Sequence, residues 1–130
     1  MCAHNGKEFD FPYLGRRFLI LGIEMPHALA QIQTAKPWEV RLIDTMQLWK
    51  FGDYKSFTSL DLMCAAMDVP TPKDDIDGSQ VGRVFWEEND ARRIAVYCEK
   101  DVLATAQVML RMCREPLVLD ADVHSELVEG

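Results

Sequence analysis

The sequence has no excess of basic residues. Its 14 Lys and Arg residues are outnumbered by 21 Asp and Glu residues, which gives a formal net charge of −7 at pH 7. A broad basic face that holds nucleic acid is therefore not expected. The acidic balance does not exclude an enzyme that contacts phosphate groups through bound divalent cations, because such ions reverse the local charge.

The cysteines form no recognisable metal or redox pattern. Cys2, Cys64, Cys98 and Cys113 include no CxxC pair, and we expect all of them to be reduced thiols. The sequence also lacks a secretory signal and any apolar run that is long enough to cross a bilayer. These absences predict a cytoplasmic protein with no membrane partner.

The residues that are present are sufficient for a folded core. Hydrophobic residues make up 48% of the 130 positions, which is ordinary for a globular protein of at most one domain. Helical spacing predominates, and the first predicted helix begins with Asp10 as N-cap and ends at Gly22. Further expected elements are a short helix around 28–33, a strand at 40–44, a helix capped by Thr58 or Ser59, and a long helix at about 90–112.

The long helix is expected to bury one apolar stripe along its length. The predicted stripe consists of Ile94, Cys98, Val102, Thr105, Met109 and Met112. Asp44 is expected to end its strand and to help cap the element that follows. The acidic segment 113–130 is expected to be a flexible tail. Two strands make a poor sheet for so many helices, so we expect that strands that would pair with them are missing.

Two segments carry polar side chains of catalytic type. The first is Asn5-Gly6-Lys7-Glu8-Phe9-Asp10, which places an amide, an aromatic ring and a carboxylate at the entry to a helix. The second contains Tyr97 and Asp101, which lie one helical turn apart on the same face. A half-buried Asp101 needs a partner or a metal ion. Each segment alone is also compatible with a purely structural role, as a capped helix start or as a hydrogen-bonded aspartate.

Taken together, these segments resemble the second and third motifs of the DEDD superfamily of 3′–5′ exonucleases. Tyr97 indicates the tyrosine branch (DEDDy). Further similarity to one bacterial group, which is related to the proofreading domain of family B DNA polymerases, extends over residues 4–112. The stretches that carry this similarity are 36–39, 43–45, 59–61, 72–81 and 97–102.

The resemblance implies an α/β, ribonuclease H-like exonuclease fold and removal of nucleotides from DNA 3′ ends. Two Mg²⁺ or Mn²⁺ ions about 4 Å apart would serve the hydrolysis. Asp10 and Asp101 would be metal ligands, and Tyr97 would orient the attacking water. Single-stranded DNA or a DNA 3′ end would be the partner, with Asn5 and Phe9 at the terminal nucleotide. Lys73, in a loop, is a candidate phosphate contact.

The sequence departs from the family pattern at the first motif. That motif is Asp-x-Glu, and no Asp-x-Glu occurs in the chain. We therefore expect residues 1–112 to be a partial exonuclease domain, with the second and third motifs only and with its first strands before Met1. Such a fragment is expected to have little activity. The alternatives are an inactive nucleic-acid-binding module and a protein-interaction module with an exposed sheet edge. An RNA substrate and any oligomeric state remain open.

Overall fold

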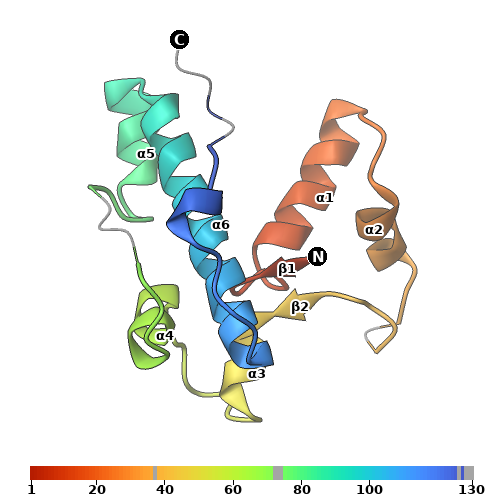
Figure 1. Cartoon of the computed structure of the whole chain (residues 1–130). Coiled ribbons are helices and arrows are strands. Elements are labelled where there is room, and N and C mark those ends of the chain that lie inside the picture. The colour runs from red at the N-terminus through yellow and green to blue at the C-terminus, as the bar shows by residue number, and fades with distance from the viewer. Residues whose placement is uncertain (37, 72–74, 126, 128–130) are drawn as a thin grey trace. The chain divides into compact units, whose positions relative to one another are not determined.

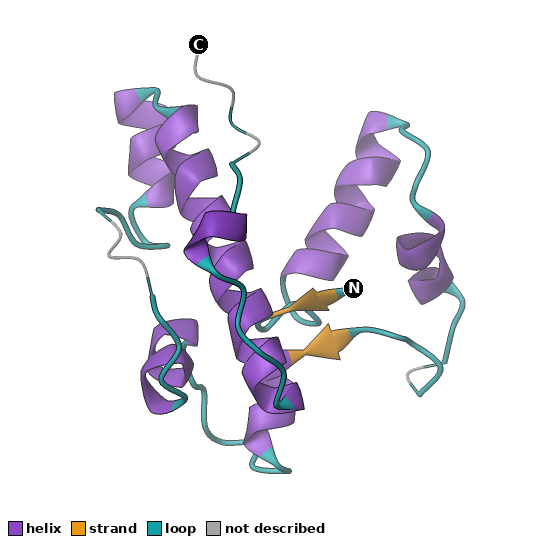
Figure 2. Ribbon diagram, viewed as in Figure 1, coloured by secondary structure: helices purple, strands orange, loops and turns teal. Residues whose placement is uncertain are grey.

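The computed structural model describes residues 1–36, 38–71, 75–125 and 127. The chain divides into two compact units, Met1–Ser59 and Leu60–Gly130. Both units are rich in helix, and the strands belong to the first unit (Figures 1 and 2). The fold is therefore of mixed α/β type with a small parallel sheet, and each unit is described by itself below.

The first unit is built around the parallel pair of β1 (Cys2–Ala3) and β2 (Ile43–Asp44). Cys2 is in register with Ile43 and Ala3 with Asp44. Between these strands the chain forms α1 (Asp10–Leu21), α2 (His27–Ala30) and the short 3₁₀ helix η1 (Gln31–Gln33), and α3 (Thr45–Lys50) follows β2 directly. The predicted helices at 10–21 and 28–33 and the strand ending at Asp44 are confirmed, although β2 is shorter than expected.

The predicted N-cap role of Asp10 is wrong. Asp10 is the first residue of α1, Phe9 occupies the N-cap position, and no side chain caps this helix end by a hydrogen bond. Asp10 instead places its carboxylate in the first helical turn, where the helix dipole favours negative charge. At the other end, Gly22 adopts φ +63° as the C-cap, a conformation that suits glycine because it has no Cβ.

The second unit contains α4 (Leu60–Ala66), α5 (Val81–Arg83), the π-helical turn η2 (Val84–Glu88), α6 (Ala91–Cys113) and the 3₁₀ turn η3 (Asp120–Asp122). Both α4 and η2 pack against α6. The predicted long helix is confirmed within one residue at each end, and Asp90 caps it by accepting the Arg93 N–H at 2.9 Å. The buried residues of this unit include Met63, Cys64, Val69, Ile76, Val84, Ala104 and Val108.

The predicted buried stripe of α6 is wrong at Cys98 and Val102. Cys98 is exposed and Val102 is 70% exposed, whereas the buried positions of this helix are Ala104, Gln107 and Val108. Gln107 can be buried because its side-chain amide satisfies a peptide group: Nε2 donates to the Val118 carbonyl and Oε1 accepts from the Val118 N–H, each at 2.9 Å. A buried polar group with both hydrogen bonds made is tolerated in a core.

Among the residues that the structure describes, no helix is both long enough and apolar enough to span a membrane.

Candidate active site

The segment that leads from β1 into α1 forms a tight turn. Asn5 adopts φ +57°, and its carbonyl accepts hydrogen bonds from the N–H groups of Glu8 at 3.3 Å and Phe9 at 3.2 Å. The Gly6 carbonyl accepts from the Phe11 N–H at 2.9 Å. The turn is thus continuous with the first turn of α1, and it brings Asn5, Phe9 and Asp10 to the same end of that helix.

Gly6 is enclosed by its neighbours in this turn. A Cβ atom at position 6 would overlap the Cβ of Ala3, would lie 3.0 Å from the Phe11 ring and would lie 3.4 Å from Oδ2 of Asp10. Gly6 is itself buried. The requirement at this position is therefore space: β1, α1 and the Asp10 carboxylate approach one another closely because residue 6 has no side chain. Sequence analysis identified no role for Gly6, and only the Asn5-Gly6 pair, a common turn sequence, gave a signal.

Asp44 connects this turn to the other strand. Its carboxylate is buried, with the residue 2% exposed. It accepts hydrogen bonds from the Asn5 N–H at 3.0 Å and the Lys7 N–H at 3.1 Å. It also caps α3 by accepting from the N–H groups of Met46 and Gln47. The predicted capping role of Asp44 is confirmed, and its contacts with the turn at 5–7 are a further finding.

His4 makes a second connection beside Asp44. Its Nε2 lies 2.9 Å from the Thr58 carbonyl oxygen, and its Nδ1 lies 3.0 Å from Oγ1 of Thr45. A carbonyl oxygen can only accept, so Nε2 carries a proton and donates to Thr58. The end of β1 is thereby joined to the start of α3 and to residue 58.

The side chains of Asn5 and Phe9 differ in their surroundings. Oδ1 of Asn5 is buried and has no hydrogen-bond partner among the described residues, so its capacity to accept a hydrogen bond is unused. Phe9 is 66% exposed, and its ring lies parallel to that of Tyr13, with centroids 6.2 Å apart. An exposed, flat aromatic ring of this kind can stack on a nucleobase.

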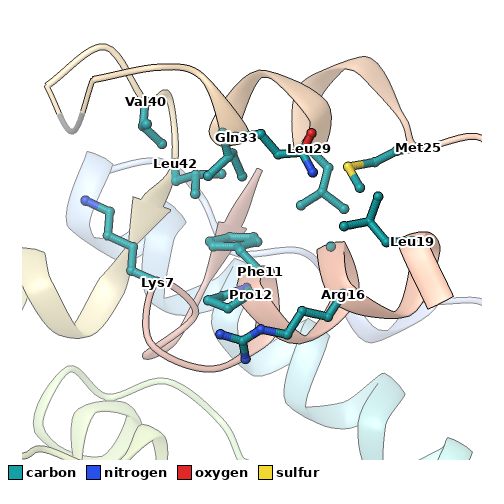
Figure 3. A pocket seen from close by; sticks show the side chains of 12 residues that line it. Lys7, Phe11, Pro12, Arg16, Leu19, Met25, Leu29, Gln33, Val40 and Leu42 are labelled. Carbon is teal, nitrogen blue, oxygen red and sulfur yellow. The ribbon is translucent and has the colours of Figure 1, made fainter.

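Next to this turn lies an apolar cavity of about 490 Å³, between α1, the α2–η1 segment and residues 40–42 (Figure 3). Phe11, Leu29 and Leu42 point into it, while Lys7 and Arg16 line its edge with their charged ends directed away from it. Asp10 does not line the cavity. Sequence analysis gave no indication of this cavity, because it is formed by segments that are distant along the chain.

In the second unit, Tyr97 and Asp101 lie one turn apart on α6, and both are half-buried. They are on the same side of the helix as the buried residues Ala104 and Val108, since the spacing 97, 101, 104 and 108 follows one helical face. A Cβ at Gly78 would lie 3.7 Å from the Tyr97 hydroxyl oxygen, so the loop before α5 is the neighbour of that hydroxyl.

The Asp101 carboxylate is close enough to α4 to influence Cys64. Burial raises the pKa of the Cys64 thiol above its ordinary value of 9.0, and the negative charges of Asp61 and Asp101 raise it further. A neutral thiol is therefore the stable form of this buried side chain.

An ion-pair cluster fixes the approach to α6 one turn before Tyr97. Nε of Arg93 lies 2.7 Å from Oδ2 of Asp75, and its Nη1 lies 2.7 Å from Oε2 of Glu88. These bonds join the loop before α5 and the π-helical turn to the start of α6. The hydrogen bond to Asp75 is the main reason that the pKa of Arg93 is raised.

The residues predicted for the site thus fall into two groups, one in each unit. Asn5, Phe9 and Asp10 come together in the first unit, and Tyr97 and Asp101 come together in the second. Lys73, the predicted phosphate contact, lies outside the described residues. The carboxylates of Asp10 and Asp101 are oxygen donors of the type that Mg²⁺ and Mn²⁺ take. Within the described part of the chain, no group of three or more His, Cys, Asp or Glu side chains is placed to hold a metal ion.

A family model described as a predicted 3′–5′ exonuclease related to the exonuclease domain of PolB matches residues 1–129. The chain belongs to this family. No curated protein and no solved structure matches the chain.

Proposed function

We propose that the chain is a metal-dependent 3′–5′ exonuclease of the tyrosine branch of the DEDD superfamily, with a ribonuclease H-like fold. The observation that carries the proposal is the family match over residues 1–129, combined with the positions of the two motifs. One motif lies at the start of α1, and the other lies on the packed side of α6. The proposed substrate is a single-stranded DNA 3′ end.

The proposal assigns a separate role to each of the site residues in the two motifs. Asp10 and Asp101 would hold the divalent ions, which when bound supply charge stabilisation at the scissile phosphate and an activated water. The Tyr97 hydroxyl would orient the attacking water, a role that does not require it to lose its proton. The exposed Phe9 ring would stack on the terminal base, and Asn5 would lie at the same nucleotide.

The negative net charge is compatible with this substrate. A protein with a formal charge of −7 repels phosphate groups over most of its surface. Binding would therefore depend on the ions held by the carboxylates, and DNA affinity should require the metal.

The test is a time course with an oligonucleotide labelled at its 5′ end, in Mg²⁺, in Mn²⁺ and in chelator. We expect slow 3′ trimming, because the chain has no Asp-x-Glu to supply further metal ligands. The trimming should require metal, and Asp101→Asn should slow it by about a hundredfold or more, because a lost ligand removes charge stabilisation. Tyr97→Phe should slow trimming by up to about a hundredfold through loss of positioning but leave metal binding intact. Asp53→Asn, at an exposed carboxylate whose hydrogen bonds stay within its own turn, is the matched control.

Two results would contradict the proposal. One is trimming that proceeds equally fast in chelator, and the other is an Asp101→Asn variant as fast as the Asp53→Asn control.

A further inference from the structure

Asp44 is a buried carboxylate whose charge is balanced by backbone groups. It is 2% exposed and forms no ion pair with any side chain in the described part of the chain. Four N–H groups, those of Asn5, Lys7, Met46 and Gln47, donate to it. Several donors are what a buried charge requires, since each removes part of the free-energy cost of leaving water.

The two oxygens of Asp44 have different partners. Oδ1 accepts from Asn5 at 3.0 Å, Met46 at 3.1 Å and Gln47 at 3.4 Å. Oδ2 accepts from Lys7 at 3.1 Å. Capping α3 needs only one oxygen, which asparagine or serine could also supply. The second oxygen is therefore used for the turn between β1 and α1, and capping alone does not account for a carboxylate at this position.

The turn that Asp44 holds is the one that carries the proposed metal ligand. Asn5 and Lys7 lie on either side of Gly6, over which the Asp10 carboxylate lies. The Asn5 carbonyl in turn accepts from the N–H groups of Glu8 and Phe9. A displacement of Asn5 or Lys7 is thus transmitted by hydrogen bonds to Phe9 and by close packing to Asp10.

We propose that Asp44 is a positioning residue for the exonuclease site, which fixes Asp10, Phe9 and Asn5 by holding the backbone at Asn5 and Lys7. This inference rests on the proposed exonuclease function. Thr45 supports the same turn through its hydroxyl, which bonds Nδ1 of His4 at 3.0 Å. The parallel register pairs Asp44 with Ala3. This pairing brings Asp44 and Thr45 close to the turn that follows β1.

The principal test is Asp44→Asn in the full chain, with Asp53→Asn as the matched control. The amide can keep the contacts of Oδ1, but its NH₂ group then faces the Lys7 N–H, donor against donor. Asp53 is an exposed carboxylate whose hydrogen bonds stay within its own turn, to Lys55 and Ser56. The same chemical change at Asp53 therefore leaves the segment 5–10 untouched.

Three quantities are measured: the rate of 3′ trimming at saturating DNA, the Mg²⁺ midpoint of that rate, and Mn²⁺ binding followed by electron paramagnetic resonance. For Asp44→Asn we expect a rate lower by about tenfold, a higher metal midpoint and weaker Mn²⁺ binding, as is usual when the groups that orient a metal ligand are changed. A residue that only stabilises the fold would lower the unfolding temperature without moving these quantities in the folded protein.

Thr45 supplies a second pair of variants if Asp44→Asn does not fold. Thr45→Val keeps the shape of the side chain but removes the hydroxyl that bonds His4, and Thr45→Ser keeps the hydroxyl. We expect slower trimming and weaker Mn²⁺ binding for Thr45→Val, and recovery of both for Thr45→Ser.

The outcomes separate this inference from the function on which it rests. A parent chain that trims no faster with metal than in chelator overturns the exonuclease function and the positioning role with it. An active parent whose folded Asp44→Asn variant matches Asp53→Asn in rate and metal midpoint overturns the positioning role alone. If Asp44→Asn does not fold, a Thr45→Val variant that trims as fast as the parent and binds Mn²⁺ with the parent's affinity overturns the positioning role alone.

Discussion

At the scale of single residues, Gly6 and Gly15 should respond to the same substitution with opposite signs. Gly6→Ala forces a methyl group against Ala3 and Phe11, and such overpacking should destabilise the fold by about 1–3 kcal/mol. Gly15 lies inside α1, where a Cβ would meet no atom within 4 Å, so Gly15→Ala should stabilise by about 0.5–1 kcal/mol. Urea unfolding followed by circular dichroism measures both values.

The comparison also bears on the site, because Gly6 borders Asp10. Gly6→Ala should weaken Mn²⁺ binding, and Gly15→Ala should leave it unchanged. A Gly6→Ala variant as stable as the parent would contradict the close approach of β1 and α1 at residue 6.

Cys64 should make stability depend on alkaline pH. Burial, Asp61 and Asp101 raise the pKa of this thiol in the folded protein. The folded chain then holds the proton more tightly than the unfolded chain does, so the stabilising contribution is complete below the unfolded pKa and is lost as pH rises through the folded pKa. In chelator, the free energy of unfolding should fall above about pH 9, and Cys64→Ser should flatten that fall.

Asp61→Asn provides the intermediate case for this titration. It removes one of the two negative charges that raise the pKa of Cys64 in the folded protein, so the loss of stability should begin at the same pH as in the parent but should be smaller and complete at a lower pH. Parallel pH profiles for the parent and Cys64→Ser would show that the thiol does not titrate as described.

At the scale of elements, the start of α6 depends on one side chain. Asp90 accepts the Arg93 N–H at 2.9 Å, and Asp90→Ala should destabilise the protein by about 1 kcal/mol. Asp90→Ser should recover most of this, since a hydroxyl can also cap. Thermal unfolding of the three proteins checks the order. Equal stability of parent and Asp90→Ala would mean that the cap contributes nothing.

The sequence predicted where α6 lies but not which of its faces is buried. Its bounds could be predicted because Asp90 is a strong N-cap and the apolar residues recur over the whole segment. The buried face of α6 could not be predicted, because apolar residues also lie along another face of the helix. That face contains Cys98 and Val102, which are exposed. Small Ala104 and polar Gln107 occupy the packed side, and the burial of Gln107 depends on a long-range partner, Val118.

At the scale of the whole molecule, Asp10 and Asp101 are predicted to be ligands of the same metal centre. The motifs and the family are the support for this pairing. We expect Mn²⁺ to broaden the amide resonances around both residues with one common midpoint. Asp10→Asn should abolish the broadening in both segments together, because a bound ion needs ligands from both.

Asp53→Asn serves as the control, since it removes an exposed carboxylate whose hydrogen bonds stay within its own turn. Broadening around only one of the two residues, or two independent midpoints, would show that they do not share a centre.

The predictable part of the candidate site is the part that is local in sequence. Asn5, Phe9 and Asp10 could be predicted to meet because they lie within one turn, and Tyr97 and Asp101 because they are four positions apart. The contacts of Asp44 with Asn5 and Lys7 and of His4 with Thr58 join residues 37 or more positions apart. These contacts form only when β1 and β2 pair in the observed register. The local sequence around each residue does not show which strands pair or in which register.

The hydrogen bonds between the turn and Asp44 also determine the order in which this part of the chain can fold during synthesis. Asn5 and Lys7 donate to a carboxylate that lies 39 and 37 positions later. At roughly 5–20 residues per second, the ribosome adds that acceptor about 2–8 s after Asn5. Helix α1 needs only local bonds, which form within about a microsecond. During synthesis α1 can therefore form well before the turn that precedes it is held in place. The position of Asp10 is fixed only after β2 has been synthesised.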